Sequence, residues 1–329
     1  MKLCILALGL VAASAANLKG MDYYQSKFDA WRVQHPDYPA TLQAFADNDD
    51  NIELHNQLFA AGNVTYELGH NQFSGLTNAQ FKKMYLASNF KAFDAARPKN
   101  YDYSLSAVRN GANDPIDWTT KGAVTPVKDQ AQCGSCWAFS TVAGMEGALF
   151  VNEGKLVSMS EQDLVSCDKN GDQGCNGGLM DNAFEWINKN GGICAESDYP
   201  YSSGSGRSGT CQKTCKNVAT NTGHKDVPKG DEDALYTALK TAPVSIAVDA
   251  GKFQSYKSGI LNPLLGCGKQ LDHGVTLVGY GTDGGKDYWK IKNSWGKSWG
   301  EEGYIRVIHG KDECGLADSA SQPTGVKSL

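Results

Sequence analysis

The sequence has no run of basic residues and, beyond its first residues, no long apolar run. Its 31 lysine and arginine residues are outnumbered by 36 aspartate and glutamate residues, so the formal net charge is −5. A protein that follows a nucleic-acid backbone needs a basic patch, and nucleic acid is therefore not expected as a partner. A membrane-spanning helix needs about 20 apolar residues, so no membrane association is expected either.

The first 16 residues contain a short apolar stretch that cannot span a bilayer. Lys2 gives a positive start, residues 4–12 are apolar, and Ala13-Ser14-Ala15 offers small residues for cleavage. This pattern is typical of a secretory signal peptide. We therefore expect residues 1–16 to be removed and the protein to enter the secretory pathway, ending in a lysosome-like vacuole or outside the cell.

Cysteine is absent from residues 17–111, although the chain has ten cysteines. Cys4 lies in the signal segment, and the other nine follow residue 132. Cysteines pair in an oxidising compartment, and nine is an odd number. We therefore expect four disulfides and one reactive thiol.

One cysteine, Cys136, lies where a glycine-containing turn meets an apolar periodic segment, in the stretch 130–140, QAQCGSCWAFS. The apolar positions that follow have the spacing of a buried helix: Ala138, Val142, Met145 and Leu149. Gly154 gives that helix a stop signal. A cysteine in the first turn faces unpaired backbone N–H groups and the positive end of the helix dipole. Both favour the thiolate, which is the nucleophilic form.

The rest of the chain has helical patterns first and strand patterns later. Residues 17–111 have only helical and loop signals, and further helical patterns follow Ser160 and Gly178. Runs rich in valine, isoleucine and tyrosine predict strands at 244–248, 274–280, 287–292 and 303–308. Helices followed by strands indicate an α+β protein with two subdomains and a cleft between them.

The QAQCGSCWAFS stretch resembles the active-site segment of papain-like cysteine proteases, in particular the cathepsin L-like group, and the resemblance covers almost the whole chain. It implies a helical left lobe and a β-barrel-like right lobe with a cleft between them, preceded by a mainly helical propeptide. The implied boundaries are a signal peptide at 1–16, an inhibitory propeptide at 17–111 and a protease domain at 112–329. The chain would then be a full-length precursor.

A thiolate nucleophile needs an oriented base, and two later motifs supply the residue types. His273, in LDHGV, can take a proton and return it near neutral pH. Asn293, in IKNSWG, can hold the other ring nitrogen without adding charge, and Trp295 can shield that bond from water. By resemblance, Gln130 donates to the oxyanion. The other five histidines are expected to be surface or structural residues: His35, His55, His70, His224 and His309.

The substrate-binding residues are also expected from the resemblance. Gly177 and Gly178 let an extended peptide approach the backbone. The pocket for the second residue before the cleaved bond is implied to be lined by Leu179, Met180, Ala247, Leu271 and Ser319, and Asp272 and Trp295 are further expected substrate-binding residues. Ala247 and Leu271 fit core packing equally well. An apolar pocket without a carboxylate at Ser319 predicts Leu or Phe there and poor acceptance of Arg. No paired-histidine insertion blocks the cleft, so an endopeptidase is expected.

Two motifs of residues 17–111 resemble the propeptides of cathepsin L-like zymogens. One is Phe45, Asn48, Ile52 and Asn56, which share a helix face, and the other is 69–75, GHNQFSG. Both depart from the family pattern: Asp37 and Thr41 stand where Glu and Arg are usual, and Gly75 stands where Asp is usual. We expect an autoinhibitory segment that is released by proteolysis at low pH. An independent N-terminal helical domain is the alternative.

The resemblance also implies the remaining partners and modifications. It pairs Cys133 with Cys175, Cys267 with Cys314 and Cys167 with Cys211, which leaves Cys194 with Cys215. Asn63 is a glycosylation acceptor by its sequon. Peptide and protein substrates, the protein's own propeptide and cystatin-type inhibitors are the expected partners of a monomer. No cofactor and no metal are expected.

Three alternative functions are disfavoured by the sequence. The sequence CGSC is a C-x-x-C motif, so a thiol–disulfide oxidoreductase using Cys133 and Cys136 is the main alternative. That motif normally follows a strand, and none is predicted here. A zinc site around Cys211 and Cys215 lacks a histidine pair or a second close cysteine pair. A catalytically inactive homologue is disfavoured because all four catalytic residue types are present.

Overall fold

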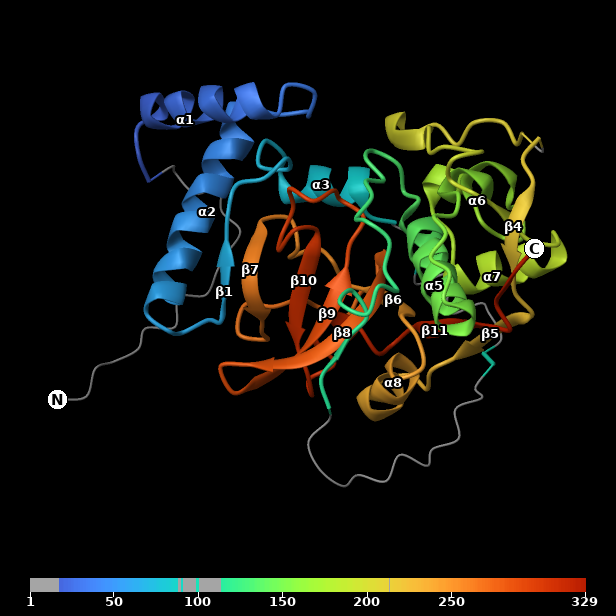
Figure 1. Cartoon of the computed structure of the whole chain (residues 1–329). Coiled ribbons are helices and arrows are strands. Elements are labelled where there is room, and N and C mark those ends of the chain that lie inside the picture. Colours follow the sequence, from blue (N-terminus) through green and yellow to red (C-terminus); the bar gives the residue numbers. More distant parts are fainter. Residues whose placement is uncertain (1–17, 88–89, 91–98, 101–113, 213) are drawn as a thin grey trace.

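The computed structural model describes residues 18–87, 90, 99–100, 114–212 and 214–329. The expected signal peptide and the expected maturation site near residue 112 lie outside these residues. The chain is an α+β protein, as predicted. Helices α5, α6 and α7 gather on one side, most of the strands form a large sheet beside them, and α1 and α2 lie at the far end of that sheet (Figure 1).

The N-terminal segment, residues 18–87, contains α1 (Met21–Gln34), α2 (Leu42–Ala60), β1 (Tyr66–Leu68) and α3 (Asn78–Tyr85). On α2, Phe45 and Ile52 are buried. Asn48 Nδ2 on the same face donates to the carbonyl oxygens of Ser74 and Leu76, at 2.8 and 2.9 Å. The predicted helix face is therefore confirmed, and its asparagine binds the backbone of the returning chain.

Strand β1 was not predicted, and the expectation of only helix and loop in this segment was wrong. β1 pairs antiparallel with β7 (Tyr256–Leu261), with Tyr66 opposite Gly259 and Leu68 opposite Tyr256. A three-residue strand is too short to show alternation in the sequence. It forms because β7 offers a free edge to which a passing segment can add.

The helical part contains α5 (Cys136–Glu153), α6 (Glu161–Cys167), α7 (Met180–Lys189) and the short helices η1 (Gly174–Asn176) and η2 (Ser203–Ser205). A three-stranded sheet accompanies it in the order β12 (Lys327–Ser328), β4 (Asn217–Thr220), β3 (Ile193–Cys194). The predicted stripe of α5 is buried throughout. Gly154 ends α5 in the left-handed region, at φ 69°, which glycine adopts without strain.

The large sheet has the order β1-β7-β10-β9-β8-β6-β11-β5, with β2 (Ile116–Asp117) beside β8. Its other strands are β5 (Gly223–Asp226), β6 (Val244–Val248), β8 (His273–Asp283), β9 (Lys286–Lys292), β10 (Tyr304–Ile308) and β11 (Ala320–Thr324). Within the described residues the path stays open, because β1 and β5 each pair with one neighbour only. The expectation of a β-barrel-like lobe is corrected accordingly. Helix α8 (Glu232–Leu239) and η3 (Glu313–Gly315) complete this part.

Helix α5 and strand β8 meet at the junction of the two parts. Ser140 Oγ on α5 donates to the carbonyl oxygen of Val275 on β8, at 2.6 Å. Ser245 Oγ on β6 donates to the carbonyl oxygen of Ser140, at 2.8 Å. These buried hydrogen bonds place the first turns of α5 against the first residues of β8, so residues far apart in sequence share one site.

Four disulfides stabilise the loops of the chain, and they are the pairs implied by the resemblance. They join Cys133 to Cys175, Cys167 to Cys211, Cys194 to Cys215 and Cys267 to Cys314. Cys136 is a free, buried thiol. Because Cys133 is bonded to Cys175, the CGSC motif does not form a disulfide within itself.

Candidate active site

Cys136 is the first residue of α5, and the turn before it is tightly held. The backbone N–H of Gly134 donates to the carbonyl oxygen of Cys175, at 2.9 Å. A Cβ on Gly134 would lie 2.5 Å from that same oxygen, so only glycine fits. The N-cap residue Ser135 makes no side-chain cap to the helix. Cys136 therefore lies at the start of a helix whose first backbone N–H groups have no capping side chain.

His273 and Asn293 come from neighbouring strand ends and contact each other directly. His273 Nε2 lies 2.8 Å from Asn293 Oδ1, and that oxygen also accepts from the backbone N–H of Ser294. An oxygen acceptor places the imidazole proton on Nε2. Among the described residues, Nδ1 of His273 has no hydrogen-bond partner, so its lone pair is available. The Trp295 ring stacks on the imidazole, with 4.6 Å between centroids.

The residue after the histidine touches the cysteine. A Cβ on Gly274 would lie 3.2 Å from both the carbonyl carbon and the oxygen of Cys136. Absence of a side chain at Gly274 thus lets the start of β8 approach the start of α5. The structure brings Cys136 together with His273 and Asn293, as expected, although Cys136 precedes both by more than a hundred residues.

Both ionisable groups of the site are fully buried, which favours their neutral forms. Burial raises the pKa of the Cys136 thiol to about 11, although the backbone N–H of Gly274 acts in the opposite direction. Burial also lowers the pKa of His273 to about 4, against the effect of its hydrogen bond to Asn293. A low-dielectric environment penalises charge on either group. The covered site therefore holds a thiol and a neutral imidazole.

Gln130 is fully buried beside the cysteine turn. Its Nε2 donates to the carbonyl oxygens of Tyr85 and Cys133, at 3.2 and 2.9 Å. Its Oε1 accepts from Ser294 Oγ at 2.6 Å, which fixes the orientation of the amide. Its backbone oxygen accepts from the Tyr201 hydroxyl at 2.8 Å. A preoriented amide donor at this position suits an oxyanion, and here a carbonyl of the N-terminal segment occupies it.

The N-terminal segment continues across the site beyond Tyr85. The backbone N–H of Ala87 donates to the carbonyl oxygen of Asp272, at 2.7 Å, next to His273. Phe90 is fully buried and belongs to the same apolar cluster as Cys136. The segment therefore excludes water from the pair that would carry the chemistry.

The apolar residues expected to bind substrate fall into two groups. Leu179, Met180 and Ala247 are buried in one cluster with Cys136 and Phe90, and Leu271 packs against that cluster. Ser319 joins it through its carbonyl oxygen, which accepts from the backbone N–H of Ala247. Trp295 stacks on the imidazole and belongs to the other apolar cluster, in the core of the large sheet.

The two glycines that were expected to let a substrate peptide approach the backbone, Gly177 and Gly178, precede α7. Gly177 has φ 111°, which disfavours any side chain. A Cβ on Gly178 would lie 2.7 Å from the Trp137 ring and from Asp172 Oδ1. The backbone at Gly178 therefore lies directly against the ring of Trp137, the residue after Cys136.

Among the described residues, one potential metal-binding group contains no disulfide cysteine: Asp181, His224 and Asp226. Its carboxylates already have protein donors, because Ser321 Oγ binds Asp181 and the backbone N–H of Asn100 binds Asp226. The group lies on α7 and β5. In the described part of the chain, every helix is too short or too polar to cross a bilayer.

Comparison with known proteins identifies the family. Residues 112–324 match the family model described as papain family cysteine protease. The chain belongs to the papain family of cysteine proteases. Residues 37–81 of this papain-family protease match the model described as cathepsin propeptide inhibitor domain (I29). It is a cysteine-type peptidase made as a zymogen, of the cathepsin L-like group, and the N-terminal segment is its propeptide.

Similar proteins come from plants and animals. Germination-specific cysteine protease 1 of Arabidopsis thaliana is 48% identical over 299 residues, covering 87% of this chain and 78% of that protein. Digestive cysteine proteinase 1 of Homarus americanus is 42% identical over 331 residues, covering 98% of this chain and all of that protein. The proform of the ragweed pollen allergen Amb a 11 cysteine protease superposes with a TM-score of 0.83 at 37% identity, covering 93% of this chain and 94% of that one.

Several residues at the papain-family site were missed by sequence reasoning. Ser294 and Tyr201 hold Gln130, while Tyr85, Ala87 and Phe90 cover the cleft. Ser294 follows Asn293 directly, so its place in the IKNSWG motif was a usable signal. The other four carry no local pattern, because their roles depend on where the folded chain places them.

Proposed function

We propose that the enzyme cleaves internal peptide bonds through a Cys136 thiolate paired with His273, with Asn293 orienting the ring and Gln130 stabilising the oxyanion. The observation that carries this proposal is the fixed imidazole: Nε2 is bound to Asn293 Oδ1, while Nδ1 is unpartnered beside the Cys136 turn. Asn293 sets the tautomer, so the nitrogen that faces the nucleophile is the one that can accept its proton.

Removal of the propeptide makes the site competent for peptide hydrolysis. Water returns to the cleft, and the burial that keeps both groups neutral is relieved. The thiol proton then moves to Nδ1 of His273, which gives a thiolate–imidazolium pair at the N-terminus of α5. The positive end of the helix dipole and the uncapped N–H groups of this helix start support the thiolate.

Catalysis proceeds in two steps. The sulfur attacks the scissile carbonyl carbon, and the oxyanion accepts hydrogen bonds from Gln130 Nε2 and the backbone N–H of Cys136. As the tetrahedral intermediate collapses, the imidazolium protonates the leaving amine and a thioester acyl-enzyme remains. Water, deprotonated by His273, then attacks the thioester and releases the acid and the thiol.

A hydrophobic residue is the proposed preference at the second position before the cleaved bond. The support is Phe90, which is buried with Leu179, Met180 and Ala247 in the zymogen. On trimmed enzyme, peptides with Leu or Phe there should exceed those with Arg at least about tenfold in kcat/KM. Ser319→Glu should narrow this ratio by offering Arg a carboxylate, whereas the matched Ser319→Gln should leave it unchanged. A library profile led by Arg in the parent enzyme contradicts the assignment.

The proposal keeps the boundaries expected from the sequence: 1–16 signal peptide, 17–111 propeptide and 112–329 protease domain. It includes passage through the secretory pathway and glycosylation at Asn63, which lies exposed between α2 and β1. A KDEL-tailed cysteine endopeptidase of Arabidopsis thaliana is among the similar proteins. We also propose that the mature enzyme is a monomer and that cystatin-type proteins inhibit it. Gel filtration of the trimmed enzyme with a cystatin tests both points.

Peptide hydrolysis by acid-matured protein tests the central proposal. Parent protein should cleave a fluorogenic peptide with an internal scissile bond, and Cys136→Ala should abolish cleavage. Iodoacetamide should modify a single cysteine of the matured parent. Modification of Cys133 together with Cys136 supports an oxidoreductase instead, which the Cys133–Cys175 disulfide argues against.

A further inference from the structure

Two carboxyl groups, those of Asp168 and Asp172, are buried close to the backbone at Gly177 and Gly178, and the proposed mechanism uses neither of them. Asp168 is fully buried at the C-terminal end of α6, and Asp172, in the loop before η1, is 5% exposed. Water solvates a negative charge far better than a protein interior does, so aspartates are rarely buried to this extent. Protein groups must therefore replace the lost water around both side chains.

The hydrogen bonds of the two carboxyl groups account for one oxygen of each. Asp168 Oδ1 accepts from the backbone N–H of Asn170, at 2.7 Å. Asp172 Oδ1 accepts from the backbone N–H of Leu179 at 2.8 Å and from Asn182 Nδ2 at 3.2 Å. The second oxygen of each group, Oδ2, is buried and has no donor among the described residues.

A proton on one of the two groups can supply the missing donor. The side chains of Asp168 and Asp172 lie within hydrogen-bonding reach of each other. Two carboxylates cannot form a hydrogen bond, and their charges repel strongly in a buried site, whereas a carboxylic acid donates to a carboxylate. Burial, together with the charge of Asp168, raises the pKa of Asp172 well above its usual value, which agrees with a retained proton.

Asp172 also contacts the backbone along which a substrate is expected to bind, residues 177–179, which we call the binding edge. Its Oδ1 holds the Leu179 N–H, and a Cβ on Gly178 would lie 2.7 Å from the same oxygen. That Cβ would also lie 2.7 Å from the ring of Trp137, the residue after Cys136. The carboxyl group therefore fixes the binding edge next to the helix that begins at Cys136.

We propose that Asp172 is a positioning residue for substrate binding, and that a proton shared with Asp168 holds its carboxyl group in place against the binding edge. The inference rests on the proposed function, because it requires a substrate peptide to bind along Gly177 and Gly178. It is independent of the chemistry that cleaves the peptide. Neither aspartate was expected at the site from the sequence.

The other charged groups around the pair act on it only from a distance. Lys169, which is exposed, and Lys189, at the end of α7, both lower the pKa of Asp168, but burial outweighs them. The Lys189 ammonium instead contacts Asn170 Oδ1 at 3.4 Å and Glu185 Oε2 at 3.5 Å. From α7 the uncharged Asn182 binds the pair directly, and α5 contributes the uncharged indole ring beside Gly178. The charge of the pair is therefore set mainly by its own proton.

The direction of the pH effect follows from the raised pKa of Asp172. In the unfolded chain aspartates ionise near pH 4, whereas the folded pair keeps its proton to higher pH. The stability that the shared proton contributes is therefore complete below about pH 4 and is lost as pH rises through the pKa of the folded pair. When this proton leaves, two buried charges repel each other and the binding edge loses its support. Substrate affinity should therefore fall at the alkaline end of the pH range.

Peptide binding to Cys136→Ala protein trimmed by an added protease tests the proposal without catalysis. Fluorescence anisotropy of a labelled peptide with Leu at the second position before the intended cleavage site gives Kd from pH 5 to pH 9. Asp172→Ala should raise Kd about tenfold at every pH, because the Leu179 N–H loses its acceptor. Asp172→Asn keeps this acceptor and offers Asp168 a permanent N–H donor. Its Kd should equal the parent's at pH 5 and stay constant to pH 9, while the parent's Kd rises at least about threefold between pH 7 and pH 9.

A matched control makes the same substitution at an exposed aspartate of the helical part. Asp198→Asn should leave the pH profile of the parent unchanged. The comparison of the parent with Asp172→Asn decides the matter even where Asp172→Ala does not fold. An Asp172→Asn profile that rises with pH as the parent's does overturns the proposal. A Kd of folded Asp172→Ala equal to the parent's, or no peptide binding by the trimmed parent, overturns it as well.

Steady-state kinetics of trimmed enzyme with Cys136 intact separate positioning from a merely structural role. With active sites counted by iodoacetamide labelling, Asp172→Ala should raise KM about tenfold at nearly constant kcat. Fewer active sites at an unchanged KM would show that Asp172 only stabilises the fold, which contradicts the proposal. Should the trimmed parent bind the peptide without cleaving it, the proposed function fails, and the binding measurements still decide the role of Asp172.

Discussion

Single residues of the propeptide occupy the groups to which the proposed mechanism assigns catalysis. The Tyr85 carbonyl oxygen takes the hydrogen bond of Gln130 that an oxyanion would receive, and Ala87 binds the backbone beside His273. Phe90 is buried in the apolar cluster that also contains Cys136. The same residues exclude water, so the thiol and the imidazole stay neutral. Inhibition is therefore both steric and electrostatic.

Replacing Gln130 by alanine should lower kcat of the trimmed enzyme by about 10²–10³ with little change in KM, because one oxyanion donor is lost. The measurement is steady-state hydrolysis of a peptide substrate. Gln132→Ala, an exposed position two residues further along, is the matched control and should retain activity. A rise in KM at constant kcat would instead assign Gln130 to substrate binding.

The rate at which Cys136 is alkylated should depend on pH differently before and after the propeptide is removed. In the intact precursor, burial raises its pKa to about 11, so the reactive thiolate should be scarce at pH 7 and increase about tenfold per unit up to pH 9.5. In trimmed enzyme the rate should already be high below pH 7. Mass spectrometry of iodoacetamide-treated protein measures both, and equal rates at pH 7 would falsify the account of the covered site.

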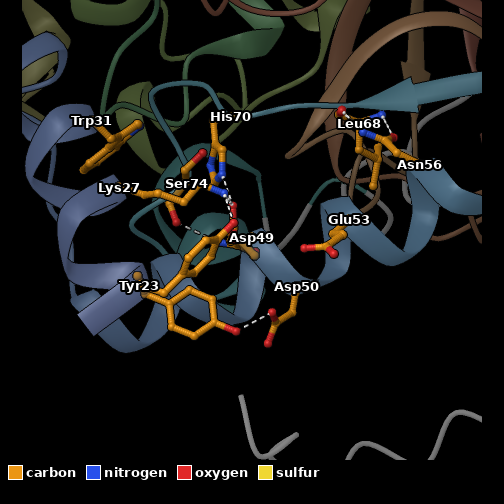
Figure 2. A network of polar contacts seen from close by, with 12 residues as sticks. Tyr23, Lys27, Trp31, Asp49, Asp50, Glu53, Asn56, Leu68, His70 and Ser74 are labelled. Carbon is orange, nitrogen blue, oxygen red and sulfur yellow. Dashed lines mark hydrogen bonds and ion pairs between the residues drawn. The ribbon is translucent and has the colours of Figure 1, made fainter. Parts of the chain in front are cut away.

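At the scale of elements, the propeptide pairs with strand β7 through β1, and hydrogen bonds from α2 fix the chain around β1. Strand β1 adds to the free edge of β7, and Asn56 on α2 fixes the end of β1: its Nδ2 donates to the Leu68 carbonyl oxygen, and its Oδ1 accepts from the Leu68 N–H (Figure 2). Asn48 Nδ2 donates to the carbonyl oxygens of Ser74 and Leu76 in the chain before α3. The asparagine side chains on the helix face predicted from the sequence spacing therefore form hydrogen bonds with the backbone of the chain that follows α2.

Asn56→Ala should destabilise the propeptide by about 1–3 kcal/mol, because the Leu68 backbone groups lose both partners. Urea unfolding of the Cys136→Ala precursor measures this in its first transition. Gln57→Ala changes the exposed neighbour on the same helix and should stay within about 0.5 kcal/mol. Equal effects of the two substitutions would show that the Asn56 contacts carry no stability.

At the scale of the whole molecule, three parts meet over one cleft. Helix α5 supplies Cys136, the sheet supplies His273 and Asn293, and the propeptide passes over both. The two protease parts are joined through the buried hydrogen bonds of Ser140 and Ser245. Because the inhibitor is part of the same chain, its local concentration is about millimolar whatever the protein concentration.

Intact precursor at pH 7 should therefore hydrolyse a peptide at least about a hundredfold more slowly than the same protein after trimming, and dilution should leave the ratio unchanged. A fluorogenic assay over a range of enzyme concentrations measures this. Precursor trimmed by an added protease, which is then inactivated, serves as the reference. A ratio that falls on dilution indicates inhibition between molecules.

The sequence by itself determined the helix that begins at Cys136 and the four strands with strong β-branched patterns, because local spacing and composition encode them, and it predicts Cys136 as the nucleophile. The family resemblance added the disulfide pairs and the likeness of residues 45–56 to a propeptide helix. Only the tertiary structure decided that Tyr85 and Ala87 bind at the site, that β1 is a strand and that the large sheet is open. These features depend on contacts between segments that are distant in sequence, and a local sequence pattern does not indicate such contacts.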